Sequence, residues 1–265
     1  MSDKLDISKL NKYVGELGLT FTKCQLNQFL QYYELLVEWN SFMNLTAITE
    51  FEEVLIKHFS DSISLIQAKD IDLIKDACIE GKSVRVLDIG TGAGFPSIPL
   101  KIAFPNLEIT MLDSLNKRIK FLDEVIAQLD LKDIVALHGR AEDYAGKITK
   151  SDKFDQSDLS QMCCRENFDI VVSRAVANLS TLSEYCLPYV KEGGIFVAYK
   201  SEELVQEQKN AEHAISILGG KIEEVIPFTL PYTEFHRSLC VIRKVRPTPK
   251  KYPRKAGTPA KEPLK

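Results

Sequence analysis

The chain has 265 residues, 45% of them hydrophobic, which is enough for one large domain with a substantial buried core. Its formal net charge is −3, no run of about 18 apolar residues occurs, and the N-terminus lacks the basic and then apolar build of a signal peptide, so neither a membrane span nor secretion is predicted. Six cysteines without a C-x-x-C pair and four scattered histidines favour a reduced, cytoplasmic protein without a metal site.

The first 80 residues show the spacing of helices and no convincing strand. Leu10, Val14 and Leu17 would share one helical face, and a second apolar face recurs through residues 26–37. We therefore expect residues 1–80 to form a helical region that packs on the rest of the protein as an N-terminal layer.

A strand, a glycine turn and a helix are predicted next. The β-branched apolar run 84–89 contains Asp88, and a helix is expected over residues 96–103. Three glycines follow the strand at alternate positions, Gly90, Gly92 and Gly94. Glycine suits a turn in which the backbone takes positive φ and a ligand comes close, as at the binding corner of a doubly wound α/β sheet.

The spacing of these glycines selects the ligand. A dinucleotide site has the pattern G-x-G-x-x-G, but Phe95 or Ser97 stands where its third glycine would be, and no lysine follows as in a phosphate-binding loop. The pattern D-x-G-x-G-x-G is typical of S-adenosylmethionine methyltransferases. A dinucleotide site and a chance glycine turn are the lesser alternatives.

The second strand is expected over residues 107–112, and it ends at Asp113. An acid at this tip can accept hydrogen bonds from both hydroxyls of an adenosyl ribose. The alternative is a helix N-cap ahead of residues 116–129, a role that Ser114 could fill as well. A third strand is expected over residues 134–137, and it leads to an acidic loop that contains Glu142. A loop at this position commonly lies against the edge of the adenine ring.

The remaining pattern completes an α/β fold. Further strands are predicted over 169–173, 194–199, 222–228 and 238–243, and helices over 179–190 and 202–218. With a hairpin around 231–236, this gives the Rossmann-like seven-stranded sheet of a class I methyltransferase, with helices on both faces and an antiparallel last strand. We assign residues 81–246 to this domain, with the polar stretch 146–167 as a long loop or lid.

The C-terminal segment, residues 247–265, is expected to be extended because five prolines oppose a helix there. Between residues 243 and 265 the sequence has nine basic residues and one acid. A basic segment of this kind suits a polyanionic partner, and a merely solvated segment is the equal alternative. Because it follows the last strand, we expect its removal to weaken the binding of such a polyanion and to leave cofactor binding nearly intact.

Several motifs, spread over nearly the whole chain, resemble one family. They are Asn44-Leu45-Thr46-Ala47-Ile48, His58-Phe59-x-Asp61-Ser62, Leu87 through Pro96, Leu112-Asp113-Ser114-x-x-Lys117-Arg118-x-x-Phe121-Leu122, Gly139-Arg140-Ala141-Glu142, Ser173-Arg174-Ala175-Val176-Ala177 and Tyr252-Pro253-Arg254-Lys255-x-Gly257-x-Pro259. The glycine loop alone indicates only a superfamily, but the Phe95-Pro96 pair after it, Ser173-Arg174-Ala175-Val176-Ala177 and the C-terminal motif are together specific. Together they are similar to the RsmG (GidB) family of bacterial 16S rRNA guanine-N7 methyltransferases.

The resemblance implies methylation of N7 of the guanine at position 527 of 16S rRNA, with naked RNA, the 30S subunit or its assembly intermediate as partner, and a monomeric enzyme. It implies a cofactor site of Asp88, Gly90, Gly92, Gly94, Phe95, Asp113, Ser114, Leu115, Ala141, Glu142 and Arg174. It also implies RNA contacts from Asn44, His58, Lys250, Lys251, Arg254 and Lys255. The chain departs from the family at Ser97, where glycine is usual, and in the longer 146–167 segment.

The chemistry agrees with this set of residues. Guanine N7 carries an in-plane lone pair and no proton, so methyl transfer needs positioning and electrostatics but no general base. Arg174, the expected catalytic residue, can bond guanine O6 or a phosphate, or it can instead pair with a carboxylate. His58 and Asp61 could touch RNA or form a buried pair. A small-molecule methyltransferase would not need the basic segment, and a non-catalytic RNA-binding assembly factor would not need the glycine loop.

Overall fold

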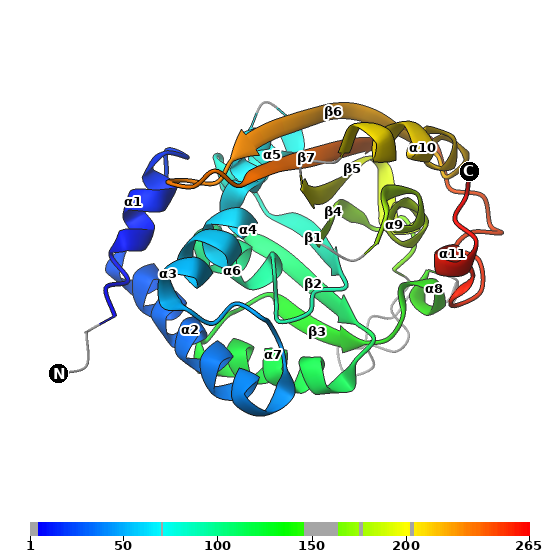
Figure 1. Ribbon diagram of the computed structural model, residues 1–265. Helices are drawn as coiled ribbons and strands as arrows, with labels where there is room; N and C mark the ends of the chain where they lie inside the picture. Colours follow the sequence, from blue (N-terminus) through cyan, green and yellow to red (C-terminus); the bar gives the residue numbers. More distant parts are fainter. Residues whose placement is uncertain (1–4, 70, 146–163, 175–176, 202–203) are drawn as a thin grey trace.

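The computed structural model describes residues 5–69, 71–145, 164–174, 177–201 and 204–265. In that part of the chain one seven-stranded sheet has the order β3-β2-β1-β4-β5-β7-β6 (Figure 1). Its strands are β1 (Val84–Ile89), β2 (Leu107–Asp113), β3 (Ile134–His138), β4 (Phe168–Arg174), β5 (Val190–Ser201), β6 (Gly220–Thr229) and β7 (His236–Lys244). The predicted seven-stranded fold is confirmed.

The order of the strands places the ligand-binding corner. Strands β1 to β5 pair in parallel, whereas β7 runs antiparallel between β5 and β6. The strand order reverses between β1 and β4, so the loops after these strands diverge and leave a crevice at their carboxyl ends. The expected antiparallel last strand and its hairpin with β6 are also confirmed.

The helix before β5 ends earlier than predicted, and β5 begins earlier than the predicted residue 194. The helix expected over 179–190 ends at Cys186, a 3₁₀ turn covers Leu187–Tyr189, and β5 begins at Val190. Pro188 explains the early end, because proline lacks the amide N–H that would continue the helical ladder.

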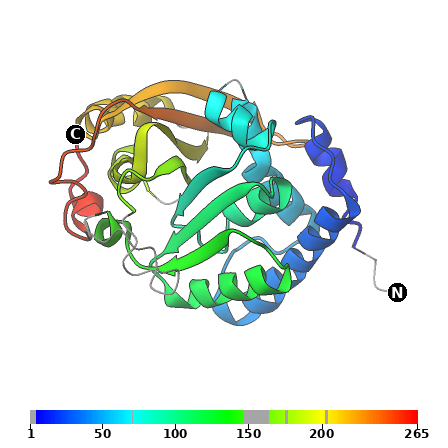
Figure 2. The same cartoon turned by 180° about the vertical axis from the view of Figure 1, so that it is seen from behind.

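Helices cover both faces of the sheet, as Figure 2 shows from behind. The helices are α1 (Lys9–Gly15), α2 (Lys23–Met43), α3 (Phe51–Val54), α4 (Asp61–Ile63), α5 (Asp72–Cys78), α6 (Ser97–Ala103), α7 (Asn116–Gln128), α8 (Ala141–Tyr144), α9 (Leu179–Cys186), α10 (Leu204–Ile217) and α11 (Thr258–Lys261). Alternate residues of β1 enter two cores: Val84 and Val86 pack with α2, α6 and α7, and Leu87 and Ile89 pack with α8, α9 and α10. This alternation is the period of two expected of a strand buried on both faces.

The N-terminal helices share the first of these cores with the sheet. Helix α2 begins at a capping box, in which Thr22 and Gln25 satisfy each other's backbone N–H groups. Near its middle, the buried Tyr32 hydroxyl donates a 2.5 Å hydrogen bond to the carbonyl of Ala93 in the glycine turn. The N-terminal helical layer therefore helps to fix the conformation of the glycine turn.

A π-helical turn, Leu55–Ser60, separates α3 from α4. It carries His58, and Asp61 follows as the first residue of α4. Such turns are often found at functional sites, because the extra residue re-aims the side chains.

The C-terminal segment packs on the domain. Thr248, Tyr252 and Pro259 are buried, and Arg165 donates to the carbonyls of Tyr252 and Thr248 at 2.8 and 2.7 Å. The segment was predicted to be extended, but it also contains the short helix α11. Most of the predicted 146–167 loop lies outside the described residues. Among the helices of the described part, none is both long and apolar enough to cross a membrane.

Candidate active site

The three glycines of the turn have different roles. All take positive φ, 74° at Gly90, 61° at Gly92 and 95° at Gly94. A Cβ on Gly94 would lie 2.6 Å from Ile98 Cγ1, so this glycine is required for packing against α6. A Cβ on Gly92 would meet nothing closer than 4.0 Å, because this glycine faces open space. Gly90 and Gly92 therefore form the wall of a cavity.

That cavity, of about 670 Å³, lies beyond the carboxyl ends of β1, β2, β3 and β4, and we call it the first cavity. Its lining comes from the glycine turn, the ends of β2 and β3, the N-terminal layer and the C-terminal segment. The residues are Leu45, Thr46, His58, Ile89, Gly90, Thr91, Gly92, Ala93, Phe95, Leu112, Asp113, Ser114, Arg118, Gly139, Arg140, Ala141, Glu142, Arg174, Tyr185, Gly257 and Ala260.

Asp113 is the buried acid of the first cavity. Its Oδ2 accepts from the Gly92 amide at 2.9 Å and from Arg118 at 3.1 Å, and its Oδ1 accepts from the Leu115 amide at 2.9 Å. A carboxylate has about four acceptor positions, so one remains for a ligand. The acid thus fixes the turn and still presents an acceptor to the cavity.

Asp88 is placed differently from the expectation. It is fully buried beneath the turn and does not line the first cavity; its Oδ2 accepts from Ser97 Oγ at 2.9 Å. Burial raises the pKa of Asp88 to about 7. Ser97, the departure from the family pattern, therefore partners this acid at the start of α6.

Arg174, at the end of β4, is held by the N-terminal layer. Its Nη1 donates to Asp61 Oδ2 at 2.9 Å, its Nη2 lies 3.4 Å from His58 Nδ1, and its guanidinium carbon lies 4.9 Å from the centre of the Phe95 ring. The expected alternative of a carboxylate partner is thus realised. The arginine nevertheless lines the first cavity as well.

His58 lies between Arg174 and Thr46, and its ring stacks on Phe95 with centroids 4.3 Å apart. Because a guanidinium can only donate, Nδ1 must be the acceptor, and Nε2–H then donates to Thr46 Oγ1 at 2.8 Å. Burial, followed by the Arg174 charge, lowers the pKa of His58 to about 3. The imidazole is therefore neutral and has no free lone pair.

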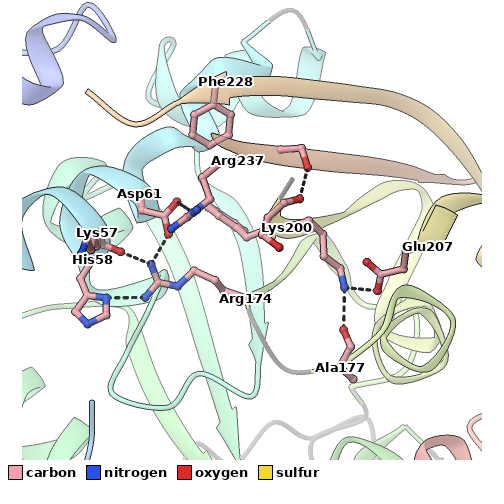
Figure 3. A pocket seen from close by; sticks show the side chains of 12 residues that line it. Lys57, His58, Asp61, Arg174, Ala177, Lys200, Glu207, Phe228 and Arg237 are labelled. Atoms are coloured by element: carbon pink, nitrogen blue, oxygen red, sulfur yellow. Dashed lines mark hydrogen bonds and ion pairs between the residues drawn. The ribbon is translucent and has the colours of Figure 1, made fainter. Parts of the chain in front are cut away.

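A second cavity of about 580 Å³ adjoins the first, and Figure 3 shows its lining. The two cavities share His58 and Arg174, so these side chains form a common wall. The other lining residues are Lys57, Asp61, Ala177, Tyr199, Lys200, Ser201, Glu207, Phe228, Arg237 and Ser238.

The C-terminal segment closes the first cavity on the side of Glu142. The Gly257 amide donates to Glu142 Oε1 at 2.9 Å, and both Gly257 and Ala260 line the cavity. The segment thus borders the first cavity although it follows the last strand, and the expected effect of its removal on cofactor binding stays a prediction.

The other predicted residues lie as follows. Of the residues predicted to bind the cofactor, eight line the first cavity: Gly90, Gly92, Phe95, Asp113, Ser114, Ala141, Glu142 and Arg174. The other three, Asp88, Gly94 and Leu115, do not line it. Asn44 is exposed and caps the end of α2 in the left-handed conformation, outside both cavities. Lys250, Lys251 and Lys255 are exposed, whereas Arg254 is bound by the buried carboxylate of Glu184.

Some lining residues escaped sequence reasoning. Arg118 follows Asp113 by five residues, and its position one turn into the predicted helix was the available signal. Thr46 lies in the Asn44–Ile48 motif, of which only Asn44 has a predicted role, and Tyr185 belongs to none of the motifs. Gly257 and Ala260 lie beyond the last strand, and the charge of their segment pointed instead to a partner.

The first cavity fits S-adenosylmethionine in its donor and acceptor set. An acceptor of Asp113 stands where ribose hydroxyls need one, and the open space beside Gly92 allows close approach to the backbone. Ala141 and Glu142 offer an apolar surface and a carboxylate at the third strand, as an adenine ring requires. Neutral His58 and the aromatic face of Phe95 place no further positive charge beside a sulfonium.

Comparison with known proteins agrees with this geometry. Residues 25–234 match the family described as GidB, rRNA small subunit methyltransferase G. The ribosomal RNA small subunit methyltransferase G of Lachnoclostridium phytofermentans is 54% identical over 98% of both chains, and that of Alkaliphilus metalliredigens is 48% identical over 94% of this chain and 95% of its own. An O-methyltransferase structure from Bacillus cereus shares the fold at a TM-score of 0.51 and 15% identity, covering 90% of this chain and 100% of its own. The chain therefore belongs to the GidB family of small-subunit rRNA methyltransferases.

Proposed function

We propose that this protein transfers a methyl group from S-adenosylmethionine to N7 of one guanine, position 527, in the 16S rRNA of the small ribosomal subunit. The cofactor is held in the first cavity, and when bound it supplies a methyl group on a sulfonium. The target base enters the second cavity as a flipped-out nucleotide, because an enzyme that modifies a base must take it out of the stack.

The observation that carries this proposal is the common wall of the two cavities. Arg174 and His58 line both, so groups seated on either side lie next to each other. Neither side chain can remove a proton: the guanidinium stays charged, and both ring nitrogens of His58 are engaged. Guanine N7 is the acceptor that suits such a wall, because its lone pair attacks without prior deprotonation.

The residues then have separate tasks. Asp113 holds the ribose, Ala141 and Glu142 border the adenine, and Arg174 orients the target base through its free N–H groups. Exposed Lys250, Lys251 and Lys255 contact phosphates, and the exposed Asn44 contributes a further RNA contact. The enzyme acts in the cytoplasm as a monomer on the 30S subunit or its assembly intermediate.

The test is to map the methyl group. Small-subunit RNA and intact small subunits, both from cells that lack the gene for this protein, are incubated with the enzyme and methyl-labelled S-adenosylmethionine. We expect mass analysis of nuclease fragments to find a single 7-methylguanosine. A methyl on an exocyclic amine or a ribose oxygen would contradict the N7 assignment, and labelled free small molecules without labelled RNA would contradict the RNA substrate.

A further inference from the structure

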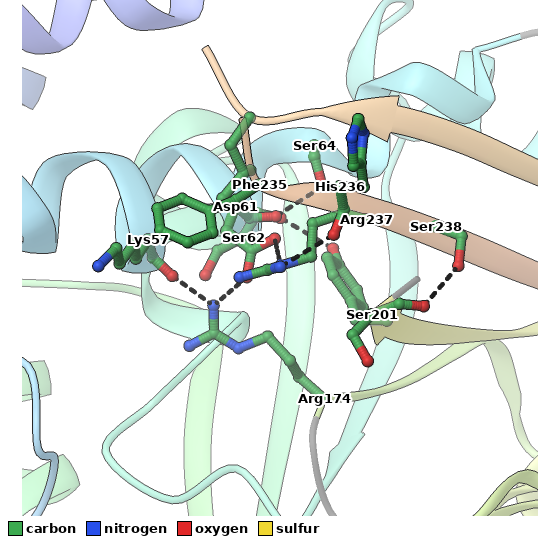
Figure 4. A network of polar contacts seen from close by, with 12 residues as sticks. Lys57, Asp61, Ser62, Ser64, Arg174, Ser201, Phe235, His236, Arg237 and Ser238 are labelled. Carbon is green, nitrogen blue, oxygen red and sulfur yellow. Dashed lines mark hydrogen bonds and ion pairs between the residues drawn. The ribbon is translucent and has the colours of Figure 1, made fainter. Parts of the chain in front are cut away.

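Asp61 lies deep in the wall of the second cavity, and only 5% of the residue is exposed. Its Oδ2 accepts from Arg174 Nη1 at 2.9 Å, but its Oδ1 has no hydrogen-bond donor among the described residues. Arg237 Nε forms an ion pair with this oxygen at 3.6 Å, which is too long for a hydrogen bond (Figure 4). A buried acceptor without a donor is costly, so a stable site that keeps one needs an explanation.

The neighbouring hydroxyl groups do not satisfy this oxygen. Ser62 Oγ donates to the carbonyl of His58 at 2.6 Å, and Ser64 Oγ donates to the carbonyl of Asp61 at 2.6 Å. The Tyr199 hydroxyl donates to the carbonyl of Ser62 at 2.8 Å. Each of these donors is aimed at the backbone, so Asp61 Oδ1 faces Arg237 and has no hydrogen-bond donor among the described residues.

The ion pair presents a donor beside an acceptor. Arg174 can only donate and Asp61 Oδ1 can only accept, and the two side chains are joined through Oδ2. Guanine carries the complementary order along one edge, with the O6 acceptor next to the N1–H donor, followed by the N2 amino group. Adenine presents a donor at N6 and an acceptor at N1, so its order is reversed and its N1 lone pair would face the carboxylate.

The placement of the cavities orients this edge. Arg174 lines both cavities, whereas Asp61 lines only the second. On guanine, N7 lies on one side of O6 and N1–H on the other. With O6 at Arg174 and N1–H at Asp61, N7 is therefore turned toward the first cavity.

Building on the proposed function, we propose that the Arg174–Asp61 pair selects guanine, with Asp61 Oδ1 accepting a hydrogen bond from N1–H of the flipped base. In the transfer, a bond forms between the methyl carbon and N7, and the carbon–sulfur bond breaks with its electron pair left on sulfur. The positive charge passes to the purine and spreads to N1–H, where the carboxylate stabilises it.

The charges around Asp61 agree with this role. Burial raises the pKa of Asp61, while the guanidinium groups of Arg174 and Arg237 oppose that rise and favour the ionised form. The other carboxylate of the cavity, Glu207, is bound by Lys200 Nζ at 2.6 Å. Of the two carboxylates that line the second cavity, Asp61 is thus the one with a buried oxygen that lacks a hydrogen-bond donor among the described residues.

The experiment compares two target bases in the full-length enzyme. The acceptor RNA carries either guanine or 2-aminopurine at the target position; 2-aminopurine keeps N7 and the N2 amino group but has no O6 and a lone pair at N1. The wild type should prefer guanine by about 10- to 100-fold in kcat/KM, the discrimination of one good bidentate contact. Equal transfer to both bases would overturn the proposal without any variant.

Asp61→Asn then tests the residue itself, since its amide can donate to the N1 lone pair. The guanine preference should fall by about 10-fold or more, and the affinity for 2-aminopurine RNA, followed by the fluorescence of the unstacked base, should rise. Glu207→Gln is the matched control and should keep the wild-type preference. Calorimetry should show S-adenosylmethionine affinity within about twofold of the wild type in Asp61→Asn, because Asp61 does not line the first cavity.

The outcomes separate the two proposals. If the wild type methylates N7 but Asp61→Asn retains the full guanine preference, the selection role of Asp61 is wrong and the proposed function stands. If the wild type places the methyl elsewhere, the proposed function itself fails. A uniform loss of transfer to both bases in Asp61→Asn would show a structural role and also overturn the proposal.

Discussion

His58 occupies the position where a catalytic base would be sought, yet its environment keeps it from titrating. Burial and Arg174 lower its pKa to about 3, against about 6.5 in an unfolded chain. We predict that the chemical shifts of its ring carbons, followed by NMR, stay constant from pH 8 to pH 5. The same ring in the protein unfolded by urea should titrate near ~6.5. A native titration near neutrality would contradict the buried, neutral imidazole.

The stability of the protein should report the same shift. Below pH ~6.5 the unfolded state takes up a proton on His58 that the folded state refuses, so the free energy of unfolding falls by up to ~1.4 kcal/mol per pH unit until about pH 3. The His58→Gln variant has no imidazole at this position, so its stability lacks this dependence on pH. The stability difference between wild type and variant should therefore narrow as the pH is lowered from 6.5, and a constant difference in urea melts would argue against it.

At the scale of elements, helix α9 fastens the C-terminal segment. The carboxylate of Glu184 is fully buried and accepts from the Arg254 amide at 2.8 Å, from Nε at 2.9 Å and from Nη2 at 2.7 Å. Arg254→Met should destabilise the protein by ~3 to 5 kcal/mol in urea melts, because it leaves this carboxylate buried and unpaired.

Glu184→Gln combined with Arg254→Met provides the control. Since the buried charge is then removed with its partner, most of the lost stability should return. The single variant should also weaken cofactor binding in calorimetry, because Gly257 and Ala260 of the same segment line the first cavity. Unchanged stability and cofactor affinity in Arg254→Met would show that the segment is not fastened by this pair.

At the scale of the whole molecule, the net charge is −3, but basic residues are concentrated in the C-terminal segment. Lys250, Lys251 and Lys255 are exposed on the C-terminal segment, whose residues Gly257 and Ala260 border the first cavity. Changing any of these lysines to glutamine should reduce the salt dependence of RNA binding by ~0.7 to 0.9 in log–log slope per lost phosphate contact. Folding and cofactor affinity should be unchanged.

Lys23→Gln is the matched control for these lysines. Lys23 is exposed at the start of α2, next to Gln25, which bonds the carbonyl of Ile102 near the end of α6, away from the cavities. Its removal should leave the slope at the wild-type value. Equal slopes for the tail variants and this control, measured by filter binding over a range of salt, would show that the tail lysines are only solvated.

The sheet could be predicted because its signals are local. Alternating apolar residues, the glycine turn and an acid at the tip of β2 each depend on a few neighbouring positions. The ion pairs could not be predicted, since Asp61 and Arg174 lie 113 residues apart and meet only after α4 has packed on the sheet. For the same reason the charge of Arg254 suggested a phosphate contact, whereas folding brings it to Glu184, 70 residues earlier. A sequence gives the charge of a residue but not its partner.

The common wall of Arg174 and His58 has a thermodynamic consequence. If the cofactor and the base occupy the two cavities as proposed, each contacts side chains that line the other's cavity, so we expect the two binding equilibria to be linked. Linkage is reciprocal: the factor by which the cofactor changes the affinity for the base equals the factor by which the base changes the affinity for the cofactor. In the proposed transfer the positive charge leaves the sulfonium in the first cavity and arrives on the base in the second, so Arg174 and its partner Asp61 border the charge before and after the reaction. A change at this wall should therefore alter product release as well as substrate binding.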